Sequence, residues 1–173
     1  MRYLRIIAMM FPLICLASLA AAVDFSVEEE LKPISGAGIK AIKEYESSSR
    51  EQFTCALIGK FVDLSGTGNP TDLIVTTENA CKWAASAGPV WVLKNKGNKY
   101  NVVLNFVTVN VELLKAKSNG LRNIKTSRGT AGYAEVEFWG YTGKRYKETV
   151  SYFFSADDET ACKAHPGICP FKF

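Results

Sequence analysis

The side chains best suited to hold a metal ion lie in one short stretch, DLSGTGNPTD, residues 63–72. Its candidate ligands are Asp63, Ser65, Thr67 and Asp72. Calcium takes about six to eight oxygens, and its affinity depends on how many of them are charged. Because only two of these four ligands are carboxylates, the stretch predicts weak calcium binding at most, and no other cofactor is indicated.

The alternative for this stretch is a tight turn between two strands. Asp63 and Ser65 would then bond backbone amides, as short polar side chains do in turns. Gly66 and Gly68 would supply positive φ angles, and Pro70 would stiffen the exit. The sequence favours this structural turn over a calcium site.

A second group that could bind a partner is aromatic and acidic. In the stretch AEVEFWGY, alternation along a strand gives an apolar face made of Ala134, Val136 and Phe138. The opposite face carries two carboxylates and two aromatic rings, at Glu135, Glu137, Trp139 and Tyr141. Such aromatics anchor protein interfaces, so this face is a candidate binding patch. The competing interpretation is that a helix or the C-terminal tail covers it.

Trp83 and Trp91 form another candidate binding pair. They flank the small residues 84–88, which could form a loop that lets a partner approach closely. The alternative is a tight connection whose tryptophans pack inward.

Residues for catalysis are sparse. His165 stands in the short sequence AHPG without a neighbouring nucleophile or orienting acid, and an exposed loop histidine is the simpler interpretation. The acids at 157–159 could be imagined as a carboxylate pair for glycoside cleavage, but three consecutive acids are typical of a solvated surface. No serine-hydrolase, phosphate-loop or zinc-protease motif is present, so the sequence argues against an enzyme without excluding one.

The first 22 residues are typical of a signal peptide. Arg2 and Arg5 precede an apolar run, and residues 20–22 are all alanine, as a signal peptidase requires. We therefore expect one domain at residues 23–173, located in the periplasm or secreted, with no membrane contact after cleavage. Loss of both arginines lowers the formal charge from +4 to +2, and such a near-neutral chain predicts no nucleic-acid partner.

The cysteines support export. Four remain after residue 22, at Cys55, Cys81, Cys162 and Cys169. An even number in an exported chain predicts two disulfides, and sequence alone allows more than one pairing. None has the C-x-x-C spacing of a zinc or redox site, and the chain contains a single histidine.

The elements that must position these residues are mostly short strands. Strand-like segments separated by turns occupy residues 53–64, 72–79, 88–96, 100–106, 107–113, 121–127, 133–141 and 145–155. Ahead of them, apolar residues recur at helical spacing over 34–45, and Ser26 with Glu29 resembles a helix start that Pro33 ends. The fold class predicted is mainly β: an antiparallel sheet or barrel-like body of hairpins with a short N-terminal amphipathic helix.

The stretch at 63–72 also predicts a strand register. Folding the chain about Gly68 sets Cys55 opposite Cys81 and Phe61 opposite Val75. Opposed residues lie about 4.5–5.5 Å apart at Cα, a distance that a disulfide accepts. This register predicts the pair Cys55–Cys81 and leaves Cys162–Cys169 as a local clasp.

The sequence DLSGTGNPTDLIV resembles the calcium-binding loop of FG-GAP or VCBS-type repeats over about a dozen residues. SNGLRNIKT, about 50 residues later, echoes it, and the hairpin FWGYTGKRYKE is similar to those of small exported bacterial proteins that carry this loop. The resemblance implies two strands joined by a turn, and it implies no particular activity. This chain departs from the pattern at Ser65 and Thr67, where the family has carboxylates or amides, and at the extra residue Thr71.

Three functions follow from these observations. The leading hypothesis is a non-enzymatic exported module that binds another protein, such as an inhibitor or a toxin-immunity protein. The second is a weak calcium-binding structural module, and the third is an unrecognised hydrolase of envelope polymers. The first is favoured because a disulfide-clasped β domain without a catalytic set suits binding, an argument by fold analogy.

Overall fold

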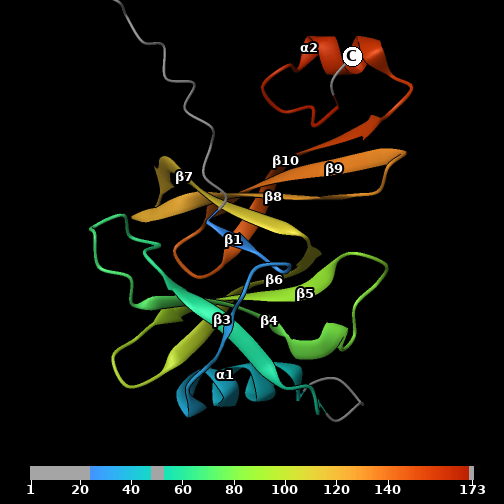
Figure 1. Cartoon of the computed structure of the whole chain (residues 1–173). Coiled ribbons are helices and arrows are strands. Elements are labelled where there is room, and N and C mark those ends of the chain that lie inside the picture. Colours follow the sequence, from blue (N-terminus) through green and yellow to red (C-terminus); the bar gives the residue numbers. More distant parts are fainter. Residues whose placement is uncertain (1–23, 48–52, 172–173) are drawn as a thin grey trace, which may run out of the picture.

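The computed structural model describes residues 24–47 and 53–171, which form two five-stranded antiparallel sheets (Figure 1). Sheet 1 contains, in spatial order, β1 (Phe25–Ser26), β7 (Asn110–Ser118), β8 (Leu121–Gly129), β9 (Tyr133–Tyr141) and β10 (Tyr146–Ser155). Sheet 2 contains β2 (Lys32–Pro33), β3 (Leu57–Val62), β4 (Asp72–Thr77), β5 (Gly88–Asn95) and β6 (Tyr100–Thr108). The mainly β prediction is confirmed. Neither sheet closes on itself, so the barrel-like alternative is wrong.

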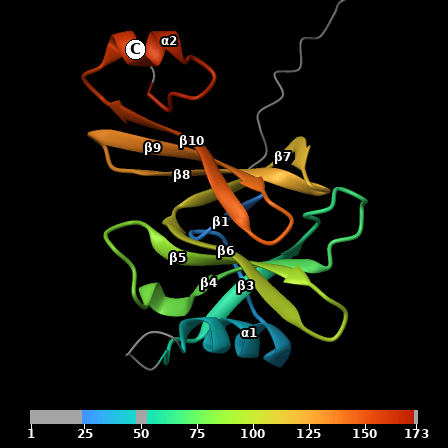
Figure 2. The same cartoon turned by 180° about the vertical axis from the view of Figure 1, so that it is seen from behind.

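The two sheets stack face to face and enclose the main core. Alternating side chains from both inner faces fill it, including Ile74, Val90, Val92, Val111, Leu113 and Ile124. Figures 1 and 2 show four layers, with α1 (Gly36–Glu46) outside sheet 2 and α2 (Glu159–Ala164) outside sheet 1. This arrangement leaves both faces of each sheet at least partly covered.

The helix α1 covers the outer face of sheet 2. The sequence predicts a helix over 34–45, and α1 spans Gly36–Glu46. Ile42 packs with Leu57, Val75 and Trp91 in a second core cluster. The apolar periodicity therefore serves this packing.

The helix start expected at Ser26 is wrong, because Ser26 ends strand β1, which pairs with β7. The capping contacts themselves do form. The amide of Ser26 donates to Glu29 Oε1 (3.1 Å), and the amide of Glu28 donates to Ser26 Oγ (3.3 Å). They close a turn between two short strands, since pairing with β7 prevails over the local helix signal.

The strand expected at 107–113 is also divided. β6 ends at Thr108 in sheet 2 and β7 begins at Asn110 in sheet 1, so the chain crosses between the sheets at Val109. The hydroxyl of Thr108 donates to the carbonyl oxygens of Ser127 (2.9 Å) and Asn110 (3.1 Å), which fixes the crossing.

Both predicted disulfides are present. Cys55–Cys81 spans 6.0 Å and Cys162–Cys169 spans 5.1 Å between Cα atoms. The register from which the first was inferred is nevertheless wrong by two residues, since Phe61 pairs with Leu73. A turn at Glu78–Ala80, in which Asn79 and Ala80 adopt positive φ (54° each), brings Cys81 back toward Cys55.

The C-terminal segment packs on the outer face of sheet 1. Cys162 joins Val136 and Phe154 in a third apolar cluster, with Ile168 and Phe171 against it. The side chain of Asp158 caps α2 by accepting from the amide of Ala161 (2.8 Å). The segment covers β9 and β10 on the face away from sheet 2.

Candidate functional site

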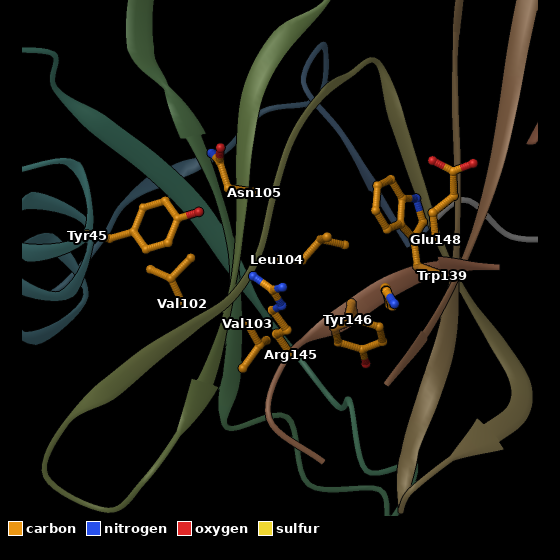
Figure 3. Close-up of a pocket in the computed structure, with 10 residues that line it drawn as sticks. Tyr45, Val102, Val103, Leu104, Asn105, Trp139, Arg145, Tyr146 and Glu148 are labelled. Atoms are coloured by element: carbon orange, nitrogen blue, oxygen red, sulfur yellow. The ribbon is translucent and has the colours of Figure 1, made fainter. Parts of the chain in front are cut away.

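Both sheets end on the same side of the molecule, and a cleft of about 250 Å³ opens between their last strands. Its walls come from α1, from β6 and from the β9–β10 hairpin. The residues that line it are Tyr45, Val102, Val103, Leu104, Asn105, Trp139, Arg145, Tyr146, Lys147 and Glu148. In Figure 3, Tyr45 and Trp139 lie on opposite sides, with Leu104 and Arg145 between them.

The aromatic wall is held rigidly by hydrogen bonds. The indole Nε1 of Trp139 donates to Thr126 Oγ1 (3.2 Å), and its ring lies 5.8 Å from that of Phe106. The buried hydroxyl of Tyr146 donates to the carbonyl oxygen of Arg122 (2.7 Å). A wall fixed in this way is already formed before anything binds, which reduces the entropic cost of binding.

The rim of the cleft is charged. Arg145, the last residue of the tight turn at 142–145, is exposed, and so are Lys147 and Glu148 just after it. The amide and hydroxyl of Thr142 both donate to the carbonyl oxygen of Arg145 (2.9 and 2.7 Å), and Tyr141 donates its hydroxyl hydrogen to the carbonyl oxygen of Gly143 (2.9 Å). Because the turn is fixed, the two basic side chains project from a defined place, and the rim has a net positive charge.

Beyond Trp139, an acidic network lies between the sheets. Arg128 Nη2 lies 2.6 Å from Glu135 Oε2 and 4.0 Å from Glu137 Oε1, and Arg128 Nη1 donates to the carbonyl oxygen of Val107. Thr126 donates its hydroxyl hydrogen to Glu137 Oε2 (2.9 Å). Burial raises the pKa of Glu137 above its ordinary value. Glu135 and Glu148 raise it further, against the opposing effects of Thr126 and Arg128.

The predicted aromatic patch faces sheet 2 and not solvent. Tyr141 is only 5% exposed within the main core, while Trp139 is half-buried at its edge. What covers this face is the second sheet, whereas the sequence offered a helix or the tail as the cover. Trp139 alone among the six predicted binding residues lines the cleft, with Glu135 and Glu137 in the network behind it.

The side chains of the other two tryptophans pack inward and hydrogen-bond within the fold. Trp91 is 2% exposed beneath α1, and its Nε1 donates to Glu46 Oε1 (2.9 Å). Trp83 is half-buried, and its Nε1 donates to Thr77 Oγ1 (3.0 Å) while its ring lies against Gly88. The inward-packing alternative describes both side chains.

The loop at 63–72 forms a hydrogen-bonded turn. Asp63 accepts hydrogen bonds from Ser65 Oγ (2.7 Å) and from the amide of Gly68, and Ser65 Oγ lies 2.9 Å from Thr67 Oγ1. Burial alone would raise the pKa of Asp63, but these hydrogen bonds lower it below its ordinary value. Gly66 and Gly68 have the predicted positive φ, of 63° and 89°.

Asp72 is separate from this cluster of oxygens. Its carboxylate is buried and accepts the amides of Leu64 (3.2 Å) and Asn95 (2.8 Å). Within residues 24–47 and 53–171 no group of three acidic, histidine or cysteine side chains is arranged to hold a metal. Lys117 also approaches the loop, since its Nζ would lie 3.2 Å from a Cβ at Gly66.

His165 and two of the three acids considered for catalysis are packed, paired or used as a helix cap. The His165 ring lies 4.8 Å from that of Tyr152 and 6.2 Å from that of Phe154. Glu159 pairs with Lys163 (2.6 Å), and Asp158 caps α2.

Most residues of the cleft were not singled out from the sequence. Arg145, Tyr146 and Lys147 belong to the hairpin FWGYTGKRYKE, which the sequence distinguishes only by its similarity to hairpins of small exported proteins. What makes them a site is the order of the strands, which sets β6 and β10 at the same side, and no local pattern carries that information.

Comparison with known protein families, with characterised proteins and with solved structures finds no match. The two disulfides fit a location outside the cytoplasm. Among the described helices, none has the length and apolar character to cross a membrane.

Proposed function

We propose that this chain is a non-enzymatic binding module whose partner is another protein. The partner docks on the side of the molecule where β6 and β10 end the two sheets. The observation that carries the proposal is the cleft between these strands, which has a fixed aromatic wall and a basic rim.

The size of the cleft favours a protein over a small molecule. Its volume of about 250 Å³ is below the range of about 300–1,000 Å³ that is typical of small-molecule sites. A cavity of this size suits one large side chain, and interfaces commonly depend on a single aromatic or aliphatic anchor in such a pocket. Arg145 and Lys147 then favour acidic groups beside the anchor, because opposite charges across an interface provide specificity.

The open strand edges provide the second element of recognition. No other described strand pairs with the outer edge of β6 or β10. A partner in an extended conformation could add its backbone to such an edge, which gives affinity through main-chain hydrogen bonds.

The compartment proposed for this role is the periplasm or the exterior of the cell, as the sequence of residues 1–22 suggests. The two disulfides support it, because such bonds persist in oxidising compartments. A rigid cross-linked module with a preformed cleft would suit an inhibitor or a toxin-immunity protein.

Selection of random peptides against the folded, oxidised protein tests the proposal. We expect peptides with one large apolar residue next to acidic residues. Tyr45→Ala and Lys147→Glu should each weaken their binding by about tenfold, equivalent to about 1.4 kcal/mol. Lys115→Glu makes the same charge change at an exposed position of β7 and should leave binding unaltered. Peptides that bind all three variants as tightly as the original chain, or no selected peptide at all, would overturn it.

A further inference from the structure

We propose that the protein bound at this side is a second copy of the chain, paired antiparallel through the outer edges of the two β10 strands. The pairing would continue sheet 1 from one copy into the other. This inference builds on the proposed function and names the partner that the edge of β10 fits.

The first observation is the composition of the edge. Residues 149–156, TVSYFFSA, contain no charged residue and no proline. Exposed sheet edges usually carry charges or prolines that prevent pairing, and a long uncharged edge promotes it. Val150 is 40% exposed and Phe153 is 66% exposed, so the edge also offers apolar surface. The C-terminal segment covers the face of β9 and β10 and leaves this edge accessible.

The second observation is the charge at the two ends of the strand. Lys144, Arg145 and Lys147 stand at its beginning, whereas Asp157, Asp158 and Glu159 follow its end. An antiparallel second copy therefore brings the basic end of one strand beside the acidic end of the other. The contact occurs twice, because a two-fold interface is formed by the same surface on both copies. Within the described chain, the carboxylate of Asp157 has no ion-pair partner of its own.

These charges also select a register. A bulge adds one residue to β10 between Glu148 and Val150. With that residue counted and the ladder continued past Tyr146 and Ser155, a two-fold axis at Tyr152 sets Arg145 opposite Asp158 of the second copy. Asp157 then opposes Tyr146, between Arg145 and Lys147 along the strand. Residues on the same face then oppose each other, as a sheet requires. An axis at Phe153 would set Lys147 opposite Asp158 but also Glu148 opposite Asp157, and like charges directly opposed are destabilising.

Sedimentation velocity of the oxidised protein over a wide concentration range is the test. We expect a monomer–dimer equilibrium. Asp157→Lys should raise the dimer dissociation constant by at least about tenfold, and so should the double variant Arg145→Glu with Lys147→Glu. Mixing the two variants should restore dimers, because one pair of ends keeps the original charges and the other sets a lysine at position 157 beside glutamates at positions 145 and 147. Circular dichroism and thermal melting confirm that each variant is folded.

Matched controls carry the same charge changes at exposed positions away from the edge. Glu78→Lys, and Lys43→Glu with Lys115→Glu, should leave the dimer unchanged. A chain that stays monomeric at every concentration overturns the inference, as does a dimer that the edge variants do not weaken or that mixing does not restore. If the dimer test fails but binding of the selected peptides still depends on Tyr45 and Lys147, the proposed function stands. If the peptide test fails as well, both proposals are wrong.

Discussion

Asp72 is where the hydrogen bonding of the loop can be tested most directly. Its buried carboxylate accepts the amides of Leu64 and Asn95, and so joins the β3–β4 loop to the end of β5. A hydrogen bond to a charged group contributes about 1.5–3 kcal/mol. Asp72→Ala removes two of them and should lower the free energy of unfolding by about 3–6 kcal/mol. Asp72→Asn keeps one acceptor oxygen and should cost about half as much.

Urea unfolding of the oxidised protein, followed by tryptophan fluorescence, measures these differences. The experiment is repeated with calcium and with a chelator, because Asp72 was also a candidate metal ligand. Glu30→Gln neutralises an exposed carboxylate and should change the stability by less than about 0.5 kcal/mol.

Two tyrosines give an independent measurement of the same carboxylate. Burial raises the pKa of Tyr100 and of Tyr146, and the charge of Asp72 raises each further. Asp72→Asn should therefore lower both pKa values in a spectroscopic titration. If Asp72→Ala costs less than about 1 kcal/mol, or costs stability only when calcium is present, the carboxylate does not hold the two amides and the reasoning is refuted.

Three further predictions concern charge. The hydrogen bonds that lower the pKa of Asp63 below 3.8 stabilise the fold above that pH, and this stabilisation is lost as the pH falls through the folded pKa. The loss of stability caused by Asp63→Asn should therefore become smaller in acid, as measured by urea unfolding at several pH values. Because the pKa of Glu137 is raised, its contribution to stability falls as the pH rises from 4.5 through the folded pKa. The stability of Glu137→Gln relative to the original chain should therefore increase toward neutral pH. A stability difference that does not change with pH would contradict this. The melting temperature should be the same in calcium and in chelator, since the loop oxygens already bond one another and backbone amides; a clear rise with calcium would contradict this.

The features that the sequence could predict are local ones. Alternation along each strand reports which residues share a face, and this is enough to identify mainly β structure. The cysteine pairs were correct because two of the cysteines are close in sequence and the other two flank a pair of neighbouring strands, Cys55 before β3 and Cys81 after β4.

The features that could not be predicted depend on distant parts of the chain. The register of β3 and β4 differs by two residues from the expected one, and Cys81 reaches Cys55 through positive φ angles at Asn79 and Ala80 that residue types did not reveal. Trp139 and Tyr141 share a strand face with two glutamates, a composition typical of a solvent-exposed face. In the folded chain, sheet 2 packs against this face. The cleft depends on strand order, which only the folded chain determines.

The N-terminal segment joins two sheets that are otherwise each built from one continuous part of the described chain. β3 to β6 follow one another along the sequence, as do β7 to β10, and the chain passes from one group to the other only at Val109. β1 is the exception, because its partner Val111 lies about half the chain away from Phe25. Closing so long a loop is costly in entropy. β1, which is synthesised well before β7, must therefore wait for it, and its docking would be a late event that locks two locally formed halves together.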